Sequence, residues 1–243
     1  MRTLRASRVA LAVLATSWAV AQAAQTPRAK RPATRPAIKL RKNLAPLPLK
    51  LPRPTAVPTP RNLPPGTRVK IPKDKWKPRK PFYAPKGVTN VALNKPVTSS
   101  DPEPLIGTLD LVTDGESEFH DGAFVELGFG VQYVQIDLGK AHAIHAIVLW
   151  HEFRDPRVYH DVIVQVANDK DFLTNVRTLH NSDHDNSAGL GIGKDWGYFE
   201  TNEGLLVDAK GVKARYVRLT SNGSTGDDLN RYTEVAVFGL KAK

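Results

Sequence analysis

Residues Tyr133–Gly139 alternate strictly along the chain. Val134, Ile136 and Leu138 share one face of the extended backbone, and tyrosine and polar residues occupy the other. A period of two is typical of a half-buried β-strand, and Gly139 is the kind of residue that ends a strand in a turn. This stretch therefore predicts one strand of a sheet with a single buried face.

The same pattern recurs through the C-terminal part of the chain. Asp161–Ala167 and Arg215–Ser221 alternate in the same way, and Glu234–Phe238 is a shorter version. Ala143–Trp150 is apolar on nearly both faces, as expected of a central strand that is covered on each side. Since no window has a convincing 3.6-residue period, residues 89–243 are predicted to form an all-β domain, an antiparallel β-sandwich.

Five segments of this domain resemble the discoidin family, also called coagulation factor V/VIII C-type domains, and occur in the order of that family. They are Asn90–Ser100, Thr113–Gly115, Tyr133–Gly139, Ala214–Leu219 and Thr233–Gly239. The family usually opens the third segment with Trp, where this chain has Tyr133. Its jelly roll is shared with family 32 carbohydrate-binding modules. The resemblance therefore implies a galactose-binding-like jelly-roll β-sandwich over residues 89–243.

The N-terminal third has a very different composition. Residues 24–88 hold 15 of the 19 prolines and 18 Lys or Arg against one acid, whereas residues 89–243 carry 14 Lys or Arg against 23 acids. Proline and like charge prevent burial of enough apolar surface, so residues 24–88 are predicted to be a disordered, proline-rich basic arm. The arm is either a stiff spacer or an adhesive for an anionic polymer. Few aromatic residues interleave its charges, which makes stacking on nucleic-acid bases a poor prediction.

The first 23 residues resemble a secretory signal. Arg2, Arg5 and Arg8 precede the apolar run Val9–Val20, and Ala21–Ala23 is a small-residue cleavage site. The run is shorter than the roughly 20 apolar residues of a membrane span. We therefore expect residues 1–23 to be a cleaved signal peptide and the protein to be secreted or to lie in the periplasm or cell envelope. With no cysteine in the chain, no disulfide can form.

The resemblance also implies a structural calcium ion beside the Asp114-Gly115 turn, with Glu234 supplied from the last strand. Carboxylates and backbone carbonyls together suit this hard cation. Phe119 stands where the family usually has a Ser or Thr ligand, and Asp121 or Glu118 could take its place. An ordinary Asp-Gly turn beside a surface glutamate is the alternative. The predicted metal ligands are Leu111, Asp114, Glu116, Asp121 and Glu234.

Two polar segments are candidates for sugar binding, the one after Ala143–Trp150 and the Gly-rich loop 180–199. An arginine fork grips adjacent hydroxyls, and an exposed indole gives a sugar ring an apolar platform. The predicted ligand-binding residues are His151, Arg154, Trp196 and Asn222. A solvated loop with internal salt bridges is the alternative. A transition-metal site of His180, His184 and Asp185 is disfavoured, because no regular element fixes their spacing.

No motif of a known catalytic nucleophile, zinc protease or phosphate loop occurs in the sequence. We therefore expect an exported, non-catalytic binding module on a basic arm, with a glycan or polysaccharide as its ligand. The alternative is a structural or adhesive envelope protein, whose domain binds another protein while the arm engages an anionic polymer. Calcium-independent binding to a protein, without any glycan ligand, would favour this alternative.

Overall fold

A computed structural model describes residues 43–54, 63, 67–69, 78–155 and 157–241. The chain divides into two units, residues 1–37 and 38–243, and every described residue belongs to the second. The predicted signal peptide, residues 1–23, lies outside the described residues. Within the described part, no helix has the length and apolar character needed to cross a membrane.

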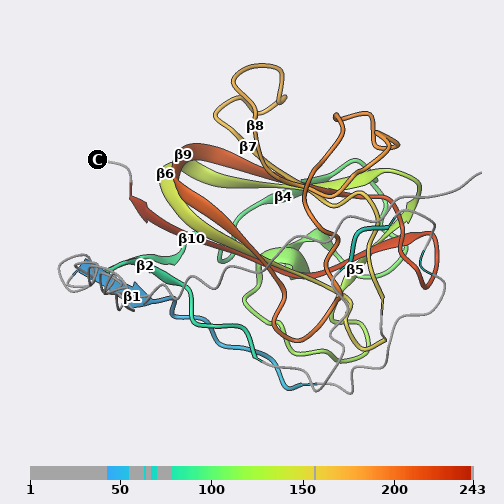
Figure 1. Ribbon diagram of the computed structural model, residues 1–243, viewed down its shortest axis with the longest axis horizontal. Coiled ribbons are helices and arrows are strands. Elements are labelled where there is room, and N and C mark those ends of the chain that lie inside the picture. The colour runs from blue at the N-terminus through green and yellow to red at the C-terminus, as the bar shows by residue number, and fades with distance from the viewer. Residues whose placement is uncertain (1–42, 55–62, 64–66, 70–77, 156, 242–243) are drawn as a thin grey trace, which may run out of the picture. The chain divides into compact units, whose positions relative to one another are not determined.

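Among the described residues of the second unit, the regular elements are almost all antiparallel strands, which confirms the predicted all-β sandwich (Figure 1). Strands of the main sheet follow the order β3-β10-β6-β9-β7-β8, with β4 also paired to β6 and β5 to β10. One short 3-10 helix, η2 (Leu109–Thr113), packs on β10. The strands are β3 (Thr89–Asn90), β4 (Val97–Ser99), β5 (Val125–Phe129), β6 (Gln132–His151), β7 (Ile163–Ala167), β8 (Arg177–Asn181), β9 (Leu205–Ser221) and β10 (Leu229–Lys241).

Strand β6 joins two segments that the sequence predicted as separate strands. Gly139 adopts φ +80° inside β6, and the register with β9 shifts between Asp137 and His142. The prediction that Gly139 ends the strand is therefore wrong. Glycine tolerates the left-handed conformation that a bulge requires, so the chain bends here without leaving the sheet.

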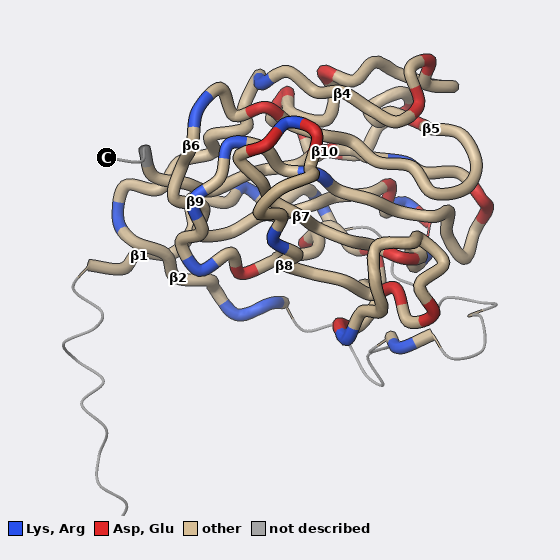
Figure 2. The backbone as a smooth tube through the Cα atoms, turned by 90° about the horizontal axis from the view of Figure 1, so that it is seen from above, with Lys and Arg blue, Asp and Glu red and all other residues tan. Residues whose placement is uncertain are grey.

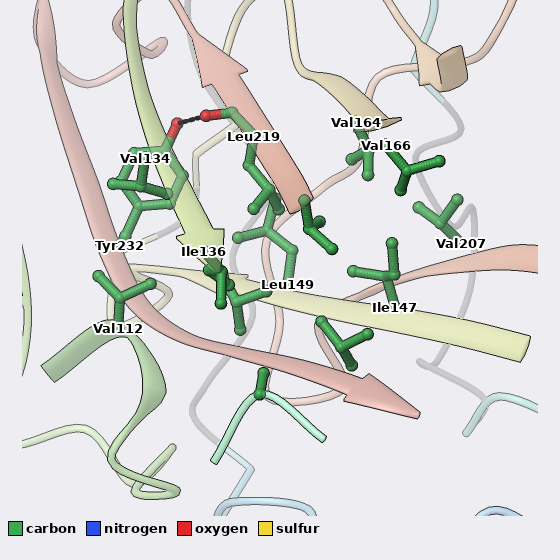
Figure 3. Close-up of a cluster of buried hydrophobic side chains, with 14 of the residues drawn as sticks. Val112, Val134, Ile136, Ile147, Leu149, Val164, Val166, Val207, Leu219 and Tyr232 are labelled. Carbon is green, nitrogen blue, oxygen red and sulfur yellow. Dashed lines mark hydrogen bonds between the residues drawn. The ribbon is translucent and has the colours of Figure 1, made fainter. Parts of the chain in front are cut away.

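The apolar faces of both halves of β6 meet in one core (Figure 3). In the first half the even-numbered residues Val134 and Ile136 point inward, and in the second half the odd-numbered residues Ile147 and Leu149 do so. The bulges between the halves produce this change of parity. Tyr232 of β10 is fully buried in the same core, where its hydroxyl donates to the carbonyl of Leu219 at 3.2 Å.

The outer face of the second half of β6 is also apolar, and part of the proline-rich arm covers it. Strand β1 (Leu44–Pro46) pairs antiparallel with β2 (Tyr83–Pro85). This confirms the prediction that the Ala143–Trp150 segment is covered on both sides. The second apolar cluster consists of Ala146, Val148, Trp150, Phe153, Ala236 and Phe238, with Leu47, Leu49 and Phe82 of the arm packed against it.

Hydrogen bonds also attach the arm to this unit. The backbone N–H of Arg79 donates to the Glu203 carboxylate at 2.7 Å, and Asn202 donates to the carbonyl of Pro52 at 2.9 Å. The predicted disorder of residues 24–88 is therefore wrong for residues 43–54 and 78–88. Leucines at alternate positions 47, 49 and 51 give this segment an apolar side that the overall composition conceals.

Replacing Phe82 with alanine should lower the free energy of unfolding by about 2 kcal/mol, because it removes a ring packed on the β6–β10 face. The neighbouring Tyr83, with half of its surface exposed, is a matched control. Tyr83→Ala should change the stability by less than about 0.5 kcal/mol. Urea denaturation of both variants measures the difference, and equal midpoints would contradict a structural role for the arm.

Candidate functional site

His151 does not face solvent. It is the last residue of β6 and is fully buried, with its ring stacked on Tyr159 at 4.0 Å between centroids. Its Nδ1 atom lies 2.9 Å from Oε1 of Glu200. The prediction that His151 donates to a sugar from a loop is therefore wrong, because the strand continues to this residue and turns its side chain inward.

Two of the charged residues that follow β6 are also buried. Arg157 forms an ion pair with Glu152 at 3.0 Å, and both side chains are nearly buried. Burial raises the pKa of Glu200, against the opposing effect of His151. These groups form the internal salt bridges weighed as the alternative from the sequence, and they lie in a desolvated network rather than a solvated loop.

Arg154 does reach the surface. Its guanidinium lies 3.1 Å from Asp121 and 4.7 Å from the centre of the Phe119 ring, with about half of the side chain exposed. Asp121, predicted as a calcium ligand, is thus paired with an arginine. Trp196 is 48% exposed, as a stacking platform requires. Sugar contact by Arg154 and Trp196 stays a prediction.

The last strand brings Glu234 to the Asp114-Gly115 turn, as the resemblance implied. The N–H of Gly115 donates to Glu234 Oε2 at 3.2 Å, while Oε1 is buried without a hydrogen-bond partner among the described residues. Burial, together with the nearby charges of Asp114 and Glu116, raises the pKa of Glu234 to about 8. A buried carboxylate with an unused oxygen beside two acids fits a bound cation.

The other predicted metal ligands are less favourably placed. Leu111 lies in η2, three residues before the turn, and Glu118 accepts the backbone N–H of Arg53. Asp114, Glu116 and Glu234 do not bring one carboxylate oxygen each to within 4.8 Å of one another. A cation here would therefore need backbone carbonyls as well.

A different site forms where three loops meet, beyond the ends of β7, β8 and β9. Ile163 of β7 pairs with Asn181 of β8 on one side and with Thr220 of β9 on the other. Two residues beyond these pairs, the antiparallel register places Asp161 between Asp183 and Asn222. The Asn222 amide donates to Asp161 at 2.8 Å. The strand register thus gathers residues that lie far apart in the sequence.

These loops enclose a groove of about 420 Å³. Of the predicted sugar-binding residues, only Asn222 lines it. Among the described lining residues none is Lys or Arg, and Figure 2 shows acidic positions gathered in the loops beyond β8. The polar lining groups come from His160, Asp161, Ser182, His184, Asp185, Ser187 and Asn222, with Thr67, Val158, Tyr159 and Gly197 completing the wall.

Three carboxylates meet at the groove. Ligand oxygens of Asp161, Asp183 and Asp185 all lie within 4.8 Å of one another. Hydrogen bonds from Ser187 lower the pKa of Asp185, so this acid stays ionised and the groove carries negative charge. The three acids could together hold a cation, and Asp161 and Asp185, which line the groove, could accept hydrogen bonds from a ligand.

The transition-metal set weighed from the sequence does not assemble. His184 accepts a hydrogen bond at Nε2 from the backbone N–H of Arg68, and His180 lies 3.8 Å from Asp195. The sequence singled out Asp185 only as a member of this disfavoured set, and it did not single out Asp183. It had no local signal for their neighbour Asp161, because only strand pairing brings that residue to them.

No family model matches the chain, and no curated protein matches it. Among solved structures, the CBM32 of AlyQ in complex with 4,5-unsaturated mannuronic acid is 20% identical, over 59% of this chain and 93% of that one, with a TM-score of 0.41. Chitosan-binding module 1 of a chitosanase/glucanase from Paenibacillus sp. IK-5 is 22% identical, over 62% of this chain and 99% of that one, with a TM-score of 0.45. The module CpGH89CBM32-4 of Clostridium perfringens, in complex with GlcNAc-α-1,4-galactose, is 16% identical, over 64% and 97%, with a TM-score of 0.46.

These neighbours are carbohydrate-binding modules, of the fold type that the sequence resembles. At such identities and TM-scores they carry no conclusion about the ligand of this chain.

Asp183 is the residue that organises the acidic loop, and its loss should be costly. It is fully buried and accepts the backbone N–H groups of Asp185, Ser187 and Ala188. An amide has a single acceptor oxygen, so Asp183→Asn should lower the free energy of unfolding by about 2 kcal/mol. Asp185→Asn, at an exposed position, should cost less than about 0.5 kcal/mol. Urea denaturation of both variants measures these free energies, and equal destabilisation would contradict the organising role of Asp183.

Proposed function

We propose that the protein is an exported, non-catalytic carbohydrate-binding module whose ligand lies in the groove between the loops after β6, β8 and β9. The observation that carries this proposal is the convergence of hydrogen-bonding side chains on a rigid sandwich edge. Asp161, Asp185 and Asn222 offer acceptors and a donor at spacings that suit adjacent hydroxyl groups. Export rests on the signal-like residues 1–23.

The charge of the groove indicates the class of sugar. With acids and no Lys or Arg among its described lining residues, the groove repels uronates and favours a protonated amine. A carboxylate and an ammonium group form a charge-assisted hydrogen bond, which is stronger than a neutral one. We therefore propose glucosamine-containing polysaccharide as the ligand.

Titration calorimetry at mildly acidic pH tests the ligand class. The glucosamine hexasaccharide should bind, while its fully N-acetylated counterpart and an oligomannuronate should bind more weakly or not at all. The N-acetylated sugar is the matched control, because it keeps the backbone and removes the amine. Equal binding of both would contradict recognition by charge.

Variants locate the binding site. Asp185→Asn should weaken binding of the hexasaccharide about tenfold or more, since a hydrogen bond to a charged group contributes roughly 1.5–3 kcal/mol. Arg154→Ala and Trp196→Ala test the residues proposed from sequence. Loss of binding in Arg154→Ala, with Asp185→Asn unaffected, would move the site to the surface beside Asp121.

The basic arm supports a second contact, with an anionic cell-envelope polymer. Residues 24–88 carry 18 Lys or Arg against one acid, while residues 89–243 are acidic overall. Clustered positive charge attracts polyanions through long-range forces that salt weakens. In this arrangement the arm anchors the protein and the sandwich binds the sugar.

Calcium should stabilise the protein if the Asp114–Glu234 site holds it. A ligand at about 100 times its dissociation constant adds roughly 2.7 kcal/mol to the folded state, which raises the melting temperature. Thermal melting of the wild type with calcium and with chelator should therefore differ, and Glu234→Gln should abolish the difference. If Asp183→Asn abolishes the difference and Glu234→Gln does not, calcium binds the Asp161–Asp183–Asp185 group instead. Identical wild-type curves would show that calcium does not stabilise the protein.

A further inference from the structure

A short piece of the proline-rich arm lies at the proposed sugar groove. Thr67 is one of the residues that line it. The backbone N–H of Arg68 donates to Nε2 of His184 at 3.3 Å, and the N–H of Gly197 donates to the carbonyl of Arg68 at 2.7 Å. Val69 forms a parallel β-bridge with Gly197. The arm and the loop between β8 and β9 are therefore joined by backbone hydrogen bonding.

Gly197 makes this approach possible. A Cβ atom at this position would lie 3.0 Å from Cγ2 of Val69 and 3.4 Å from Cγ1 of Val158. The first distance is too short for an ordinary contact between carbon atoms. A side chain at 197 would therefore require Val69 or Val158 to shift by a few tenths of an ångström.

The contact also orients a groove residue. Nε2 of His184 accepts the N–H of Arg68, and this hydrogen bond ties the His184 ring to the arm. Arg68 acts here through its backbone, as a positioning residue.

Both flanks of this piece are attached to the same unit. Pro52 and Arg79 are hydrogen-bonded to Asn202 and Glu203. Tethering at two ends shortens the segment that must be closed, and so it reduces the entropy lost when residues 67–69 dock. Docking can then persist with few contacts of its own.

We propose that residues 67–69 of the arm form one wall of the groove and determine its ligand specificity, through Thr67 and through the orientation of His184. This proposal rests on the proposed function. It gives the proline-rich segment a part in recognition beyond that of a spacer or an anchor.

Two substitutions at one position test the wall. Arg68→Pro deletes the N–H that holds His184, whereas Arg68→Ala keeps this N–H and removes only the exposed side chain. In the full-length protein, Arg68→Pro should weaken binding of the glucosamine hexasaccharide about tenfold, and Arg68→Ala should stay within about twofold of the wild type. Gly197→Ala, which crowds Val69, should also weaken binding. Equal affinities in all four proteins, or tighter binding by Arg68→Pro, would overturn the proposal.

Hydrogen exchange gives a readout that does not depend on any sugar. The Gly197 amide is protected by the carbonyl of Arg68, so its exchange should be faster in Arg68→Pro than in Arg68→Ala. Equal exchange rates would show that the arm does not dock, and the proposed wall would fail. If the wild type shows this protection and binds no hexasaccharide, the ligand class fails while the docking stands.

Discussion

The second half of strand β6 is apolar on both faces, and the rest of the structure depends on covering both. One face packs into the sandwich core with Leu149 and Ile147, and the other carries Val148 and Trp150. An exposed apolar surface of this kind is costly in water, so it requires a second layer. The chain supplies that layer from its own arm, through Leu47, Leu49 and Phe82. The arm is therefore bound to the fold for a hydrophobic reason, in spite of its charge and proline content.

Attachment of the arm at both ends also constrains the residues between the two attachment points. Once residues 43–54 and 78–88 are held, residues 67–69 are restricted to the neighbourhood of the same unit. They reach the loop at Gly197 and the ring of His184, both at the groove. The same arm therefore packs its leucines on the outer face of β6 and places residues 67–69 at the groove.

Charge is distributed according to burial. Arg157, Glu152 and Glu200 are paired in the interior, where an unpaired charge would be very unfavourable. Asp161 and Asp185 lie at the groove, where nearby donors keep them satisfied and leave a net negative charge. Glu234 differs because the charges beside it are those of two acids, Asp114 and Glu116, and its buried Oε1, like Oε2 of Glu200, has no hydrogen-bond partner among the described residues. This unmet oxygen is what supports the calcium proposal.

The sequence by itself determined the all-β class and located parts of β6, β7, β9 and β10, because a period of two is a local property that each segment displays alone. It also placed Glu234 beside the Asp114 turn, through the family resemblance. Only the tertiary structure decided that His151 is buried, that Gly139 bends a strand, and that part of the arm is ordered. It alone joined Asp161 to Asp183 and Asn222, because strand register relates residues that no sequence spacing connects. Burial and register are properties of pairs of segments, and therefore a reading of single segments cannot supply them.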